Sequence, residues 1–325
     1  MKTFISLSAL FLSLSLTAQS NTATWYLNDS SLNGIQSPSN TANGAYSTAM
    51  GEETQSNGEN STATGYKTYA GGNGSTAMGW NTTASGTVST AMGDNTTASG
   101  IASTAMGWQT TASGIVSTAM GRDTSASGGY STAMGVETTA SGGFPTAMGN
   151  YTTASGIAST AMGYTSTASG DYSTAIGAVT TAEDYMTVAL GVYNKTDETP
   201  NPNNFSYQNT AFVIGNGGHD NDGNYIGTPE SYSNAFEVLF DGTTTIAGDL
   251  NVNSDARLKA NIISLGSTLS KLLQIDGKSY TMKKDESEKQ KIGLLAQDIE
   301  KVFPELVSES HGVKSVNYQG LVPVL

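Results

Sequence analysis

Residues 75–88 read STAMGWNTTASGTV, and residues 89–102 repeat them as STAMGDNTTASGIA. The glycine that ends each Ala-Met-Gly recurs every 14 residues from Gly51 to Gly191. A second glycine series runs seven residues out of phase with the first, from Gly58 to Gly170. A fixed period of this kind is the signature of a repeat architecture, in which each unit is one coil or one supersecondary element.

Each half of the repeat is predicted to form a short strand of about five residues followed by a turn. Threonine favours strands, and glycine supplies the positive φ of a tight corner. Strand alternation places Thr48 and Met50 on one face, with Ser47 and Ala49 on the other. Two strands and two turns make one coil of a flattened solenoid. Eleven such coils, at a strand spacing of about 4.8 Å, form a stack about 50 Å long.

One coil buries little apolar surface, so stacked coils and neighbouring chains have to provide the stability. The alanine face is the expected place for chains to approach closely. The variable positions are expected at turns on the surface, where they either tolerate variation or bind a ligand. Their larger side chains are Trp80, Trp108, Arg122, Asp123, Tyr151 and Tyr164.

Residues 44–192 resemble the head repeats of YadA-type trimeric autotransporter adhesins, which read Ser-x-Ala-x-Gly with a 14-residue period. The resemblance implies a left-handed parallel β-roll and a homotrimer of chains packed side by side. This chain has Thr and Met where the family prefers Val and Ile. The membrane anchor of the family is not found at its C-terminus, so we expect no direct membrane span.

The N-terminus predicts export. Lys2, the apolar run Phe4–Leu16 and the small residues before Gln19 together form a secretory signal peptide over residues 1–18. The apolar run is too short to span a membrane. Residues 19–43 form a separate N-terminal segment. We therefore expect a secreted or cell-surface protein, and the absence of cysteine means that disulfides do not stabilise it.

Composition and charge divide the chain. Only 37% of residues are hydrophobic and 38 are glycine, which argues against a conventional globular core. The first 254 residues hold 18 of the 27 acidic residues but only 4 of the 14 basic residues. An acidic body argues against a nucleic-acid partner, because phosphate binding needs clustered Lys and Arg.

Residues 193–253 lose the period and are predicted to form a β-rich shaft, with strands at 211–215, 234–240 and 243–252. The stretch from His219 to Gly223 lacks the ligand spacing of a calcium loop and is expected to be a solvated turn. We expect no metal site and no cofactor.

Residues 254–325 have the composition of a small α+β domain. Helices are predicted at 264–273 and 292–302, and strands at 278–283 and 315–318. The segments SDARLKANI (254–262) and GLLAQDIEKVFPELV (293–307) resemble the intramolecular chaperone domain of phage endosialidase tailspikes. In that family the domain trimerises, guides folding of the fibre before it, and then releases itself by proteolysis.

The resemblance implies a catalytic Ser254 and Lys259, with support from Asp255, Arg257, Gln297 and Asp298. A serine hydroxyl needs a base, and a lysine serves as one only when its surroundings lower its pKa. The alternative is a helix-capping serine beside a surface lysine. The family continues into a long helix where this sequence stops, so we expect either a truncated copy of the domain or a fragment of a longer sequence.

The leading hypothesis is a trimeric, adhesin-like fibre whose only enzymatic activity is a single-turnover cut beside Ser254. A host surface, matrix protein or glycan is a possible ligand. Two alternatives stay open: the same fibre with a chaperone domain that does not cleave, and a carbohydrate- or ice-binding solenoid. Ice binding needs a uniform threonine face, which the methionines of the repeat interrupt.

Overall fold

The computed structural model describes residues 26–28, 34–36, 39–219, 226–283 and 290–324. The predicted signal peptide and residues 220–223 of the predicted turn lie outside them. The chain divides into two compact units, Met1–Leu239 and Phe240–Leu325. Each is described by itself.

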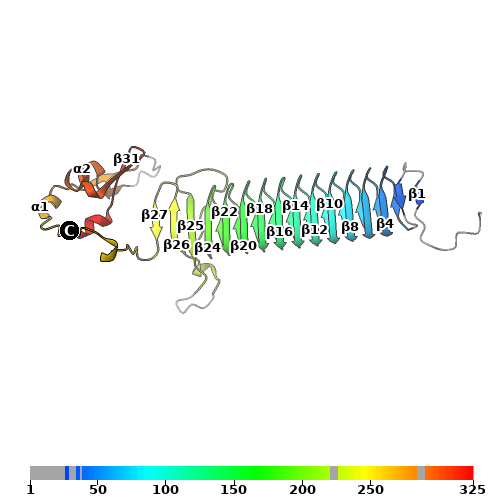
Figure 1. The fold of residues 1–325 in the computed structure, drawn as a ribbon, viewed down its shortest axis with the longest axis horizontal. Helices are drawn as coiled ribbons and strands as arrows, with labels where there is room; N and C mark the ends of the chain where they lie inside the picture. Colours follow the sequence, from blue (N-terminus) through cyan, green and yellow to red (C-terminus); the bar gives the residue numbers. More distant parts are fainter. Residues whose placement is uncertain (1–25, 29–33, 37–38, 220–225, 284–289, 325) are drawn as a thin grey trace, which may run out of the picture. The chain divides into compact units, whose positions relative to one another are not determined.

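The first unit is a parallel β-solenoid with one coil per 14 residues, as predicted (Figure 1). One wall consists of five-residue strands in which every residue pairs with the residue 14 positions later, as Thr90 does with Thr104 and Met92 with Met106. The strands of this wall are β4 (Thr48–Glu52), β6 (Thr62–Tyr66), β8 (Thr76–Trp80), β10 (Thr90–Asp94), β12 (Thr104–Trp108), β14 (Thr118–Arg122), β16 (Thr132–Val136), β18 (Thr146–Asn150), β20 (Thr160–Tyr164), β22 (Thr174–Ala178) and β24 (Val188–Val192).

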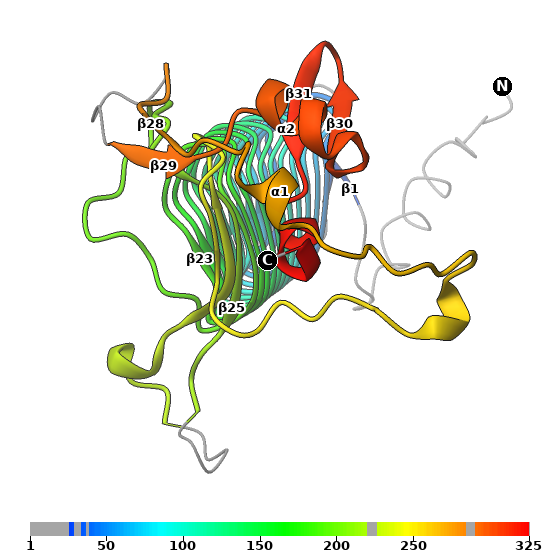
Figure 2. The ribbon, with the colours of Figure 1, turned by 90° about the vertical axis from the view of Figure 1, so that its left-hand side faces the viewer.

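The second wall consists of shorter strands than predicted. Each has only two residues, because the chain bends around a glycine directly after the alanine-serine pair. The strands are β3 (Thr41–Ala42), β5 (Gln55–Ser56), β7 (Tyr69–Ala70), β9 (Thr83–Ala84), β11 (Thr97–Ala98), β13 (Thr111–Ala112), β15 (Ser125–Ala126), β17 (Thr139–Ala140), β19 (Thr153–Ala154), β21 (Thr167–Ala168) and β23 (Thr181–Ala182). Viewed end-on, the coils superpose (Figure 2).

The interior of the solenoid is filled by small side chains. Ser47 and Ala49 are fully buried inside the coil while Thr48 and Met50 face outward, as the alternation predicted. The alanine columns therefore lie within one chain. The expectation that the alanine face contacts other chains is wrong, since neither alanine column has any exposed surface.

The glycines are required mainly by close approach of the coils. A Cβ on Gly100 would lie 1.9 Å from the carbonyl oxygen of Gly114, and the same clash recurs along both glycine series. The glycines that end Ala-Met-Gly have a positive φ, as Gly107 does at 124°. The second series does not. Its corners are turned by non-glycine residues such as Val116 at φ 53°, so the prediction that these glycines supply the positive φ is wrong.

Asparagine side chains cap the buried threonine column at both ends. Asn40 and Asn194 occupy the position of Thr54 and Thr180, one period further out on each side. The Asn194 amide donates to the carbonyl oxygen of Thr181 at 2.9 Å and accepts from its N–H at 2.7 Å. Asn40 accepts from the N–H of Thr54 at 2.8 Å. The amides thus replace the backbone groups of a missing coil.

Flanking strands extend the long wall. At the N-terminal end, β1 (Tyr26–Asn28) is antiparallel to β2 (Gly34–Gln36), which is parallel to β4. At the other end, β25 (Thr210–Asn216) stacks in parallel on β24 and pairs antiparallel with β26 (Asn234–Leu239), which confirms the two predicted strands. A 3-10 turn, η1 (Pro229–Ser231), lies between them.

Carboxylates attach the start of the predicted shaft, the segment that follows the solenoid, to the last coil. Buried Asp184 stands in the column of Gly170 and accepts the N–H groups of Asn201 at 2.6 Å and Thr210 at 3.4 Å. The Thr210 hydroxyl lies 3.4 Å from a carboxylate oxygen of Asp197 and 3.2 Å from one of Glu237. Partial burial, a hydrogen bond with Asp184 and the nearby charges together raise the pKa of Asp197 to about 7.

The second unit is a small α+β domain, as predicted. Its elements are β27 (Thr244–Ile246), η2 (Ala256–Leu258), α1 (Leu269–Leu272), β28 (Lys278–Tyr280), β29 (Lys291–Gly293), α2 (Ala296–Val302), η3 (Pro304–Leu306), β30 (Val307–Ser310), β31 (Val313–Val316) and η4 (Gln319–Val324). Ile299, Phe303 and Val324 form its buried core.

Several predicted boundaries in this unit were wrong. Residues 291–293 form a strand that pairs with β28, so the helix begins only at Ala296. The helix predicted over 264–273 is one turn long, the strand predicted over 243–252 covers three residues, and the last strand lies at 313–316 rather than 315–318. The period of apolar residues alone does not separate a short strand from the start of a helix.

Adjacent glycines test the close-approach argument. A Cβ on Gly128 would lie 1.7 Å from the carbonyl oxygen of Gly142, whereas a Cβ on Gly129 would meet no atom within 4 Å. Gly128→Ala should lower the free energy of unfolding by at least about 2 kcal/mol, because the coils cannot separate locally. Gly129→Ala should change it by less than about 0.5 kcal/mol. Urea unfolding of both variants measures the difference, and equal losses would contradict the argument.

The carboxylate cluster predicts a pH dependence. Because the folded-state pKa of Asp197 lies above its ordinary value of 3.8, its stabilising contribution is complete below that value and is lost as pH rises through about 7. We expect a decrease in unfolding free energy of about 1 kcal/mol or less, since solvent screens this side chain. Asp197→Asn should abolish the decrease, whereas Asp123→Asn at an exposed turn should leave it unchanged in urea titrations across this pH range.

Candidate autoprocessing site

Ser254 and Lys259 are brought together by a single turn of chain. The Lys259 Nζ donates a hydrogen bond to the Ser254 Oγ at 2.7 Å. Between them lies the 3-10 turn η2, which is closed by hydrogen bonds from the N–H of Leu258 to the carbonyl of Asp255 and from the N–H of Lys259 to the carbonyl of Ala256. The whole segment is exposed in the single chain.

Asp255 and Arg257 hold this turn in shape. The Asp255 carboxylate accepts from the backbone N–H of Arg257 at 2.8 Å, which makes Asp255 the N-cap of η2. It also accepts from the guanidinium Nη2 at 2.6 Å. These hydrogen bonds from Arg257 lower the pKa of Asp255, which keeps the carboxylate ionised and the turn capped. The structure thus gives both residues an organising position.

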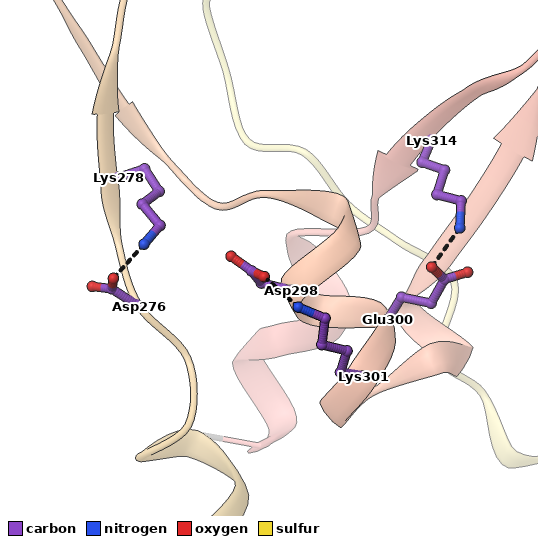
Figure 3. A network of polar contacts seen from close by, with 6 residues as sticks. All are labelled: Asp276, Lys278, Asp298, Glu300, Lys301 and Lys314. Atoms are coloured by element: carbon purple, nitrogen blue, oxygen red, sulfur yellow. Dashed lines mark hydrogen bonds and ion pairs between the residues drawn. The ribbon is translucent and has the colours of Figure 1, made fainter.

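Gln297 and Asp298 lie in another part of the unit, in the first turn of α2. The Lys301 Nζ donates a hydrogen bond to the Asp298 Oδ1 at 2.9 Å, and this contact lowers the pKa of Asp298 (Figure 3). Nearby ion pairs join Lys278 to Asp276 and Lys314 to Glu300. No hydrogen bond between described residues links Gln297 or Asp298 to Ser254 or Lys259. In the single chain, α2 is held by its own charge network.

Apolar residues around the Ser254–Lys259 turn were not singled out from the sequence. Leu258, Ile262 and Ile263 are all exposed, with Ile263 at 84%. Ile292 on β29 is 87% exposed. Aliphatic side chains with this much exposed surface are unusual in a domain with a three-residue core. The signal in the sequence was the pair Ile262-Ile263 directly after the motif, which has no place in a solvated turn.

The larger residues at the variable repeat positions are exposed, as predicted, except Asp123, which is half-buried. Tyr66 and Trp80 stack with ring centroids 4.1 Å apart, and Tyr151 meets Tyr164 edge-on at 6.4 Å. Arg122 lies between the carboxylates of Asp123 and Glu137 at 3.5 and 3.8 Å. Trp108 stands on the same corner of the coil. The corner carries both aromatic and charged groups, and Glu53 and Lys67 at its N-terminal end line a shallow pocket of about 400 Å³.

Among the described residues, no group of three or more His, Asp or Glu side chains is arranged to hold a metal ion. His219 contacts the carbonyl of Gly217 at 3.4 Å. The described helices include none that is long and apolar enough to cross a membrane.

Two family models match the chain. The YadA head domain repeat matches residues 42–68, 70–96, 98–124, 126–152 and 154–179, each match covering two coils. The chaperone of endosialidase matches residues 254–308, which include the Ser254–Lys259 turn and α2. The chain is therefore similar to YadA head repeats over most of its solenoid and to an endosialidase chaperone domain over residues 254–308.

A curated relative is the long tail fiber protein Gp37 of Escherichia phage AR1, which is 32% identical over 91 residues. The match covers 25% of this chain and 8% of the phage protein. The chain thus spans less than a tenth of the relative it matches. Together with the two family models, this similarity supports a fibre or adhesin-like protein that carries a chaperone domain.

Proposed function

We propose that this protein is an exported trimeric fibre whose C-terminal domain drives assembly and then removes itself by a cut beside Ser254. The observation that carries the proposal is the 2.7 Å hydrogen bond from Lys259 Nζ to Ser254 Oγ on a turn organised by Asp255 and Arg257. A preformed nucleophile–base pair is the minimum arrangement for such chemistry. The predicted signal peptide places the fibre outside the cell, where a host surface, matrix protein or glycan is its proposed ligand.

Assembly supplies what the single chain lacks. A lysine base must be neutral, and burial is the physical means of lowering a lysine pKa. The exposed Leu258, Ile262 and Ile263 flank the pair, so burying them against other copies would exclude water from the Ser254–Lys259 turn. Burial of these apolar residues would therefore also create the dry surroundings that the catalytic pair needs. Cleavage then follows correct assembly.

The solenoid provides a second surface for assembly. The outward face of the long wall carries a threonine column and a methionine column that follow the 14-residue coil, from Thr48 and Met50 onward. Met78 is 38% exposed, and its neighbours in the column are partly exposed. Methionine packs adaptably against apolar surfaces. We assign this face to the side-by-side contact of three chains.

The proposed reaction balances without a cofactor. The Ser254 Oγ attacks the carbonyl carbon of Asn253 while Lys259 takes the hydroxyl proton. The C–N bond between Asn253 and Ser254 then breaks, Lys259 returns the proton to the leaving amine, and the Asn253 acyl group is held as an ester on Oγ. Water hydrolyses this ester. A cut at the Ser254–Asp255 bond is the alternative, and the fragment mass separates the two.

Intact mass spectrometry of purified full-length chains tests cleavage. Wild type should yield a fragment beginning at Ser254, and Ser254→Ala or Lys259→Met should slow its appearance at least about a thousandfold, since each removes half of the pair. Ser279→Ala, an exposed serine on β28, is the matched control and should cleave at the wild-type rate. An uncut trimeric wild type would favour the alternative of a permanent chaperone scaffold.

Analytical ultracentrifugation of the same samples tests assembly. Ser254→Ala should sediment as a particle of three full-length chains, because blocking the cut leaves the assembling domain in place. Ile263→Asn should reduce both the trimer fraction and the cleavage rate of an otherwise wild-type chain, since the exposed isoleucine loses its apolar contact. A monomeric Ser254→Ala protein would contradict the proposed assembly, whatever the cleavage result.

A further inference from the structure

One corner of the solenoid carries exposed apolar side chains in a backbone conformation that disfavours them. Every fourteenth residue from Val88 to Met186 turns this corner, and all have a φ between 52° and 63°. We call this column the apolar ridge. Its large members are Val88, Val116, Tyr130, Phe144, Tyr172 and Met186, and their exposed fractions lie between 43% and 63%.

The backbone at these positions favours other residues. Left-handed φ values suit glycine and asparagine, whereas β-branched and bulky residues adopt them rarely. Asparagine does occur there, at Asn60 on the same column two coils before Val88. Valine at 88 and 116 therefore costs backbone strain while its side chain remains in water. Neither property stabilises the single chain.

The opposite corner of the same coils carries polar and charged side chains among its aromatic ones. It turns with the same left-handed φ, and its residues across the coils of Val88 to Phe144 are all polar: Asn81, Asn95, Gln109, Asp123 and Glu137. Further along, this column also holds Tyr151 and Val179, and the column before it holds the exposed Trp80 and Trp108. What distinguishes the apolar ridge is that its strip has no charged side chain between Thr87 and Ala158, whereas the opposite corner carries charges such as Asp94, Arg122 and Glu137.

We propose that the apolar ridge contacts a second copy of this chain, along the axis of the solenoid. The proposal deepens the side-by-side trimer proposed above and rests on it. Contact over successive coils requires a partner whose groups recur at the same strand spacing of about 4.8 Å. A second copy of this chain has the same spacing because it is built from the same 14-residue coils. A small ligand or a globular partner has no such repeat.

Charge points to the same occupant. The first 254 residues hold 18 acidic and 4 basic residues, so two solenoids approaching at random bring carboxylates together. Two columns form this side of the solenoid: the ridge residues and the residues directly before them in sequence. Between Thr87 and Ala158 neither column contains a charged side chain. Ile101, Ile115 and Ile157 in that preceding column are also exposed and widen the apolar strip. This strip is where two acidic copies can meet without repulsion.

The ridge is also continuous with the threonine–methionine face. From Val88 to Ala158 the ridge residue is followed at the second and fourth positions by the outward threonine and methionine, as Val116 is by Thr118 and Met120. A neighbouring copy packed on that face therefore reaches the ridge without a gap. A contact between unlike surfaces of successive copies forms a ring when the rotation between copies closes, and a side-by-side trimer is such a ring.

A triple variant tests the ridge. Val116→Asn, Tyr130→Asn and Phe144→Asn together place the residue that the left-handed backbone prefers on three successive coils, so the solenoid should keep its circular dichroism spectrum. The matched control is Tyr151→Asn, Thr165→Asn and Val179→Asn, three successive coils of the opposite corner with φ between 52° and 57°. Both are made in the full-length chain with Ser254→Ala, so that cleavage does not alter the mass.

Sedimentation over a dilution series gives the outcome. The ridge variant should raise the trimer dissociation constant on the order of a hundredfold over the control. If both variants stay equally trimeric, or both dissociate equally, the ridge proposal fails while the trimer stands. If the Ser254→Ala parent is monomeric, the trimer itself fails, and the ridge contact with it.

Chemical labelling provides a second readout, because the chain has no cysteine. A single Tyr130→Cys should react with a maleimide at least about tenfold more slowly in the trimer than after dissociation in mild denaturant. Tyr151→Cys on the opposite corner should react at similar rates in both states. Equal protection, or equal reactivity, at the two positions would overturn the assignment of the ridge as the contact.

Discussion

The contact between glycines of successive coils is the constraint on which the solenoid depends. The carbonyl oxygen of one glycine lies where an alanine in the preceding coil would place its methyl group, as the Gly114 oxygen does over Gly100. This contact permits the strands to stack at full hydrogen-bonding distance on both walls. It also requires both glycines up to Gly170, beyond which Asp184 takes the second position in the last coil, and it confines sequence variation to the corners between them.

The same constraint limits stability. A coil narrow enough for glycine-on-glycine stacking has room inside only for Ala, Ser and Thr. Such a core removes little apolar surface from water per residue. Backbone hydrogen bonds and the asparagine caps at Asn40 and Asn194 complete the single chain, while larger apolar groups are left outside, on the methionine column and the apolar ridge. The second unit repeats this pattern, since its core is small and Ile263 and Ile292 are exposed. Both units therefore leave apolar side chains exposed in the single chain.

At the candidate site, local and distant residues differ in how far the sequence reveals them. Ser254 and Lys259 lie five residues apart around one capped turn, so chain-local geometry brings them together. Asp255 and Arg257 belong to that same turn. Gln297 and Asp298 follow from the second motif alone, and in the single chain Asp298 pairs with Lys301 instead. Whether a residue some 40 positions away contacts the turn depends on tertiary and quaternary packing, which no local pattern encodes.

The sequence by itself determined the 14-residue coil, the inward direction of Ser and Ala and the outward direction of Thr and Met. It could do so because period and alternation are properties of the chain that backbone geometry converts directly into structure. Tertiary structure alone decided that the alanines fill one chain rather than an interface, and that the second glycine series serves coil contact rather than a positive φ. It also decided that the column from Val88 to Met186 turns its corner in a left-handed backbone. These depend on what the next coil places opposite each residue, and that neighbour is 14 residues away in sequence.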